Sequence, residues 1–169
     1  QARLHETKGD LDGALDLLEE AERRFIRTPV PIIRPIAALK TRIRIAQGRI
    51  AEALDWVLAR DLSVDDDISY LHEFEHMTLA RVLIAQEKRG LVDGSIHDAQ
   101  GLLERLLQAA EEGGRKGSVI EILVLQALAH EVQGNFAPAL VSLERALTLA
   151  EPEGYVRTFV DEGLPMAKL

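Results

Sequence analysis

The sequence predicts an all-α fold, a tetratricopeptide-like α-solenoid in which about four helix pairs stack into a right-handed superhelix. Three observations predict it. A glycine-led pattern recurs four times along the 169 residues, apolar residues follow each copy at helical spacing, and the copies lie about 40 residues apart. This period is longer than the roughly 34 residues of the common tetratricopeptide repeat. Because one helix pair cannot bury its apolar stripe alone, such repeats must stack.

The repeated pattern is a glycine, one polar residue, one large apolar residue, two variable positions and an alanine. Clear copies begin at Gly9, Gly48 and Gly134, and a weaker copy begins at Gly94. We expect each glycine to end one helix in a left-handed conformation and the apolar residue to open the next helix. The alanines, which would let a neighbouring helix approach closely, are Ala14, Ala53, Ala99 and Ala139. The pattern therefore predicts the second helix of four pairs.

The first helix of each pair is predicted upstream of each glycine. Two of these helices carry apolar stripes at Ile36, Leu39, Ile43 and Ala46, and at Leu71, Phe74, Thr78 and Val82. Residues 119–132 are apolar nearly all round, which is typical of a helix packed on both flanks. Leu4 is assigned to a truncated first helix, and residues 151–169 to a further, incomplete helix.

Short breaks separate the predicted helices at residues 28–35, 61–67, 88–94 and 113–117. None has the length of an interdomain linker, so residues 1–169 are predicted to form a single domain. The third break contains about seven extra residues. They explain why the turn glycines are 39, 46 and 40 residues apart rather than evenly spaced.

Composition narrows the possible functions. The chain carries 20 basic and 28 acidic side chains, a formal net charge of −8, and no cysteine. Spread negative charge argues against direct contact with nucleic acid, and the lack of cysteine excludes disulfides, thiolate zinc sites and cysteine nucleophiles. The apolar runs are too short for a membrane helix, and residues 1–10 hold no secretory core. We therefore expect a cytoplasmic chain without membrane contact.

The sharpest apparent motif is H-E-x-x-H at His72, Glu73 and His76, which places two zinc ligands one helical turn apart with a carboxylate base between them. A zinc peptidase also needs a third ligand. The metzincin continuation fails, because Leu79 and Val82 occupy the positions of its glycine and histidine. We interpret the motif as a polar helix face and expect no metal. A structural metal and a catalytic zinc are the alternatives.

Two loops resemble ion sites. Residues 113–118 combine glycines with two cations but lack the P-loop spacing, so we interpret them as a helix C-cap, a turn and an N-cap at Ser118. Asp65, Asp66 and Asp67 are interpreted as negative charge at a helix N-terminus. No serine-hydrolase or dinucleotide-binding signature is present in the sequence. We expect neither catalysis nor a cofactor.

The remaining candidate site is the concave face, which the first helices would line. Aligned helices place Arg42 and Arg81 at equivalent positions, one residue after the small residues Thr41 and Ala80. Helical phase adds three further residues to the ligand or partner groove, namely Phe74, Glu121 and Glu131. The alternative is that the repeated arginines form only contacts between repeats.

Three stretches carry a family resemblance: Leu79–Leu83, Ala146–Tyr155 and Arg157–Gly163. They resemble the superhelical region of bacterial LuxR-type ATP-dependent transcriptional regulators, the MalT-like family. The segment from Gly114 to the C-terminus resembles the end of that region. The similarity as a whole covers roughly the last hundred residues, and the rest matches by repeat pattern.

The resemblance implies a larger regulator whose NTPase and helix-turn-helix domains lie outside this chain. Its helical region would receive an inducer or a protein partner and couple that binding to transcription. The identity of the inducer or partner, and self-association, stay open. The rival hypothesis is a generic tetratricopeptide scaffold that binds a partner peptide or helix.

Overall fold

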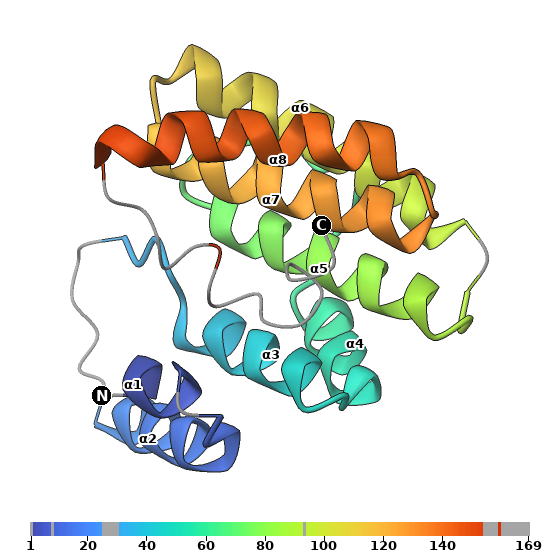
Figure 1. The fold of residues 1–169 in the computed structure, drawn as a ribbon. Helices are drawn as coiled ribbons and strands as arrows, with labels where there is room; N and C mark the ends of the chain where they lie inside the picture. The colour runs from blue at the N-terminus through green and yellow to red at the C-terminus, as the bar shows by residue number, and fades with distance from the viewer. Residues whose placement is uncertain (1, 8, 25–30, 93, 154–158, 160–169) are drawn as a thin grey trace. The chain divides into compact units, whose positions relative to one another are not determined.

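The computed structural model describes the chain except residues 1, 8, 25–30, 93, 154–158 and 160–169 (Figure 1). The elements, in chain order, are α1 (Ala2–Thr7), α2 (Leu11–Arg23), α3 (Ile36–Ala46), α4 (Ile50–Ala59), α5 (Glu73–Lys88), α6 (Ser95–Glu112), α7 (Lys116–Val132), α8 (Phe136–Ala150) and the 3-10 turn η1 (Glu151–Glu153). The described residues include no strand, and the predicted all-α class is confirmed.

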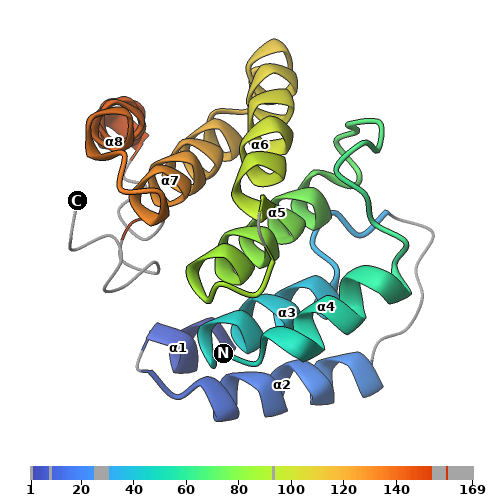
Figure 2. The same cartoon turned by 90° about the vertical axis from the view of Figure 1, so that its right-hand side faces the viewer.

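The chain divides into two compact units, Gln1–Val82 and Leu83–Leu169, with the boundary inside α5. In the first unit α1 packs on α2, α2 on α3 and α3 on α4. In the second unit α6 packs on α7 and α7 on α8 (Figures 1 and 2). Each of these helices contacts its neighbour in sequence, as expected of stacked helix pairs. The single domain stays a prediction.

The predicted turn glycines end helices as expected at Gly9, Gly48 and Gly134, with φ of 76°, 78° and 75°. At Gly134 the backbone N–H donates to the Glu131 carbonyl and the next N–H, of Asn135, donates to the His130 carbonyl, both at 2.9 Å. This pair of bonds is the Schellman motif, which requires a left-handed residue and satisfies the last carbonyls of the helix.

Gly94 has a different role from the predicted one. Helix α5 ends at Lys88, and Gly90, with φ 61°, forms the left-handed turn after it. The Gly90 N–H donates to the Glu87 carbonyl at 2.8 Å, and the Leu91 N–H donates to the Gln86 carbonyl at 3.1 Å. Gly94 instead precedes α6 as its N-cap, with φ 88°. The inserted residues therefore supply their own glycine for the helix end, and this displaces the repeat glycine to the start of the next helix.

The small residues of the repeat lie where helices meet. The four pattern alanines are fully buried, as are Thr41, Ala80 and Ala127. Ala14 and Leu15 of α2 and Ile43 of α3 form a local core, and the partly buried Ala2 of α1 packs against it. In α7 nearly every side chain from Val119 to Ala129 is buried, because α6 and α8 both pack against this helix. The predicted close approach and the predicted two-sided packing are both confirmed.

Some predicted boundaries are wrong. Leu71 lies before α5 and is 47% exposed, so it does not belong to a buried stripe. Leu4 lies in α1, as predicted. Most of the predicted C-terminal helix and residues 28–30 of the first break lie outside the described residues. Within the described part of the chain, no helix combines the length and apolar character needed to cross a membrane.

Candidate functional site

Two of the predicted groove residues meet in the first unit. Arg42 lies on α3 and Phe74 in the first turn of α5, and the guanidinium carbon of Arg42 is 3.7 Å from the centroid of the Phe74 ring. A guanidinium over an aromatic face is attracted by the negative face of the ring, and the attraction is stronger where water is excluded. The ring is buried, with 3% of its residue surface exposed.

Hydrogen bonds fix Arg42 in this position. Its Nε donates to Thr78 Oγ1 at 2.9 Å, and its Nη2 makes a longer contact of 3.5 Å with the Phe74 carbonyl oxygen. The Thr78 hydroxyl in turn donates to the same carbonyl at 2.8 Å. Arg42 therefore links α3 to one turn of α5. This observation agrees with the alternative of a contact between repeats, and it also leaves a cation beside an aromatic ring.

A second guanidinium approaches the same ring. The Arg34 guanidinium carbon lies 5.3 Å from the Phe74 centroid, and Arg34 is exposed. Arg34 is not predictable from the repeat pattern, because it lies in the segment before α3, outside the repeats. Its approach to Phe74 depends on the path of that segment, which helical periodicity does not predict.

The other three predicted groove residues are placed by their helices. Arg81 lies on α5, seven residues after Phe74, and is partly buried. Glu121 and Glu131 lie on α7 in the second unit and are also partly buried. The groove of five residues stays a prediction, of which the structure shows one contact, between Arg42 and Phe74.

Residues of the H-E-x-x-H segment make polar contacts within the fold. Glu75, which is 2% exposed, lies 2.7 Å from Arg60 Nη2 and 2.9 Å from His72 Nδ1. His76 Nε2 lies 3.1 Å from Asp66 Oδ2, and His76 is also buried. Two of these partners, Arg60 and Asp66, precede the motif in the chain. The motif thus fastens the loop between α4 and α5 to the start of α5.

These contacts refine one expectation and correct another. The motif residues are polar, as predicted, but His72 lies before α5 and is exposed, whereas Glu73, Glu75 and His76 are buried. Asp66 lies seven residues before the first residue of α5 and pairs with His76 and with the Ser63 N–H, so it is not a charge at the helix N-terminus. Among the described residues, no three or more His, Asp or Glu side chains are arranged to hold a metal ion.

The glycine-rich loop forms the predicted C-cap but not the predicted N-cap. The Gly114 N–H donates to the Glu111 carbonyl at 3.0 Å, and the Arg115 side chain donates to the Ala109 carbonyl at 2.7 Å. Helix α7 begins at Lys116, so Ser118 lies inside the helix. Arg115 therefore acts on the end of α6, which accounts for one of the two cations that resembled an anion site.

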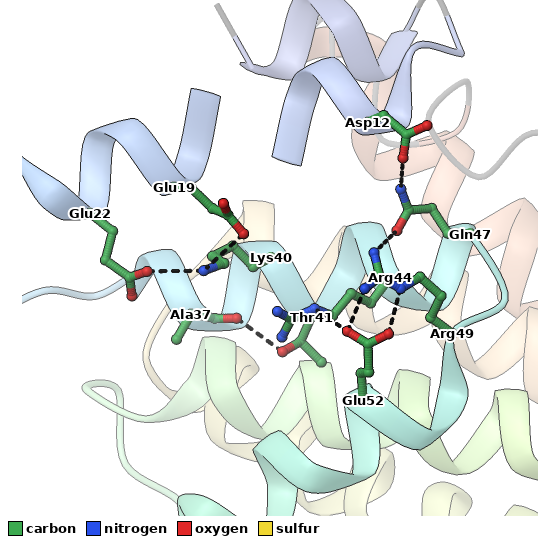
Figure 3. A network of polar contacts seen from close by, with 10 residues as sticks. All are labelled: Asp12, Glu19, Glu22, Ala37, Lys40, Thr41, Arg44, Gln47, Arg49 and Glu52. Atoms are coloured by element: carbon green, nitrogen blue, oxygen red, sulfur yellow. Dashed lines mark hydrogen bonds and ion pairs between the residues drawn. The ribbon is translucent and has the colours of Figure 1, made fainter. Parts of the chain in front are cut away.

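Ion pairs and amide contacts tie α2, α3 and α4 together at the surface (Figure 3). Lys40 on α3 lies 3.0 Å from Glu22 and 3.7 Å from Glu19, both on α2. Glu52 on α4 accepts from Arg49 at 2.5 Å, and its other carboxylate oxygen lies 3.4 Å from Arg44 Nε. Partly exposed pairs such as these contribute little individually, typically under about 1 kcal/mol, so they fix register more than they stabilise.

His130 is a predicted source of pH dependence in the second unit. It lies on α7 next to Gln100 of α6, and burial lowers its pKa below the ordinary 6.5. Because the unfolded chain then takes up a proton at higher pH than the folded chain, His130 contributes stability above pH 6.5 that is lost as the pH falls. Between pH 7.5 and 5.5, we expect the free energy of unfolding to fall less in the His130→Gln variant than in the wild-type chain. Urea titration at each pH measures it.

The control is His97→Gln, which changes an exposed histidine on α6. We expect this variant to keep the pH dependence of the wild-type chain. Equal pH dependence of the His130→Gln variant and the wild-type chain would show that burial of His130 does not affect stability.

The fold defines a helical-repeat protein of the tetratricopeptide class. Its helices pack on their neighbours in sequence, turn glycines follow the helix ends, and buried alanines lie between the helices. A family model described as the MalT-like TPR region matches residues 1–169, and the chain belongs to this family. The predicted resemblance is thereby confirmed. No curated protein and no solved structure matches the chain.

Proposed function

We propose that the chain is the sensor or effector-binding region of a LuxR-type, MalT-like transcriptional regulator that acts in the bacterial cytoplasm. The family match over residues 1–169 carries this proposal. Regulation requires that the inducer or partner binds the resting and active states with different affinity. Repeated helices that contact mainly their sequence neighbours can transmit such a difference through their interfaces.

We also propose that the chain binds rather than catalyses and holds no cofactor. The side chains that resembled catalytic or ion-binding motifs support this, because they make contacts within the fold. His72 contacts Glu75, His76 contacts Asp66, and Arg115 is engaged with the end of α6. Each group would have to leave a partner before it could serve a substrate.

The second candidate function is a tetratricopeptide scaffold for a partner protein. Exposed apolar side chains on α8 favour it, namely Phe136, Leu140, Val141 and Leu147, which are between 49% and 67% exposed. Exposed apolar surface of this kind is typical of protein interaction sites.

A thermal-shift screen separates the two candidates. The probes are oligosaccharides, amino acids, aromatic acids and nucleotides, followed by calorimetry. If the chain is a sensor, one compound should raise the unfolding temperature saturably, since a ligand at 100 times its Kd adds about 2.7 kcal/mol. The Arg42→Gln variant should lose this shift and Arg89→Gln, an exposed control, should keep it. No shift from any class, with binding of a protein partner, would favour the scaffold.

A further inference from the structure

Most of the large exposed apolar residues of the first unit lie close in the chain to Arg34 or to Phe74. The unit has large exposed apolar side chains at Ile32, Ile33, Leu58, Tyr70 and Leu71. All except Leu58 lie within four residues of Arg34 or Phe74 in the chain. Figures 1 and 2 show the segment before α3 passing beside the first turns of α5. The contact between Arg34 and Phe74 brings together the two short segments that carry these side chains. We call Arg34 with Ile32, Ile33, Tyr70 and Leu71 the Arg34 patch.

The charge of the Arg34 patch is available to a ligand. Among the described residues Arg34 makes no hydrogen bond or ion pair, and its guanidinium faces only the Phe74 ring. Stacking on the ring holds a guanidinium in place while its edge N–H groups still point outward. The planar fork of those N–H groups matches a carboxylate, which can accept two parallel hydrogen bonds. Arg42 adds a second positive charge at the same ring.

We propose that the Arg34 patch binds a peptide segment of a protein partner that carries a carboxylate next to apolar side chains. This inference rests on the proposed binding function and names its partner class. A peptide is favoured over a free small acid because the patch is open. Ile32, Ile33, Tyr70 and Leu71 are each between 39% and 48% exposed, whereas small ligands are held in concave sites that bury most of their surface.

The net charge of the chain means that only short-range contacts can attract an acidic peptide to the Arg34 patch. The net charge of −8 repels an acidic peptide at long range, but charges more than about 8 Å away are largely screened at physiological salt. Close pairing with Arg34 and burial of the isoleucines must therefore supply the affinity. Arginine is enriched among the interface residues that carry most of the binding energy.

The test is fluorescence anisotropy with fluorescein-labelled ten-residue peptides that alternate Glu with Leu or Phe. The matched peptides replace every Glu by Gln or by Lys. We expect saturable binding of at least one Glu peptide and binding at least about tenfold weaker for its Gln and Lys counterparts. Arg34→Glu should weaken the binding of the Glu peptide at least about tenfold. Arg89→Glu, the same charge change at an exposed site of the second unit, should leave it unchanged.

A second pair of variants tests the apolar half of the patch. Leu71→Ser should weaken the binding of the Glu peptide several-fold. Leu91→Ser, which changes a residue that is 55% exposed and lies outside the Arg34 patch, should not weaken it. Unchanged far-UV circular dichroism and unfolding temperature show that the variants are folded. Equal binding by Arg34→Glu and Arg89→Glu, or no binding by any Glu peptide, overturns the proposal.

Free acids give the remaining outcome. If benzoate or octanoate binds as tightly as the best Glu peptide and depends on Arg34, the site takes a small acid and the peptide proposal is wrong. If the peptide proposal is overturned but a compound from the thermal-shift screen still binds the Arg34→Glu variant, the sensor function is supported and only the Arg34 patch is excluded. The two proposals therefore fail separately.

Discussion

Leu106→Ala should lower the free energy of unfolding by about 2–5 kcal/mol, the largest effect expected in this chain. Leu106 lies in α6, is fully buried, and is among the largest completely enclosed side chains. Truncation removes the transfer free energy of the lost carbons and leaves a cavity, because the packed neighbours on α6 and α7 relax only in part. Urea titration followed by circular dichroism measures the change.

The matched control is Leu147→Ala, which makes the same change on α8 at a side chain that is 49% exposed. We expect a loss below about 1 kcal/mol there, since water already reaches half of the residue. Equal losses for the two variants would contradict the burial that the fold assigns to α6.

Ala139→Leu should cost about 1–3 kcal/mol through overpacking. Ala139 is fully buried in α8, where this helix packs against α7. Three extra carbons at this position force the two helices apart or push side chains off their preferred rotamers. Differential scanning calorimetry measures the fall in the unfolding temperature.

Ala137→Leu provides the comparison, because Ala137 is exposed on the same helix. Leucine and alanine have similar helix propensity, so this variant should stay within about 0.5 kcal/mol of the wild-type chain. If Ala139→Leu unfolds at the wild-type temperature, the alanines of the repeat do not mark close helix contacts.

The repeat pattern predicted most of the fold, because each of its residues has a local physical role. The glycine supplies a left-handed residue at Gly48 and Gly134, and the alanine supplies space at Ala53 and Ala139. These requirements are satisfied within one turn of chain, so they are visible in the sequence. The same logic failed at Gly94, because an insertion with its own glycine changed which residue ends the helix.

The site was less predictable because its contacts join segments far apart in the sequence. Helical phase assigned Arg42 and Phe74 to the same groove, and the structure brings them into contact. Phase could not reveal Arg34, which reaches the ring from a non-helical segment. It also could not show that His76 would pair with Asp66, since that contact depends on the path of a loop.

The turn glycines bear on how repeat proteins gain or lose helix pairs in evolution. A Cβ added at Gly9 or Gly134 would meet nothing within 4 Å, so only backbone conformation restricts these positions. The turns at Gly9, Gly48 and Gly134 share nearly the same φ, between 75° and 78°. If a gene duplication has its boundaries at these turns, the copied helix pair is joined to the next one through a turn of the same backbone conformation. The fold can therefore lengthen or shorten by whole repeats, and the insertion before Gly94 shows that a junction also tolerates new sequence.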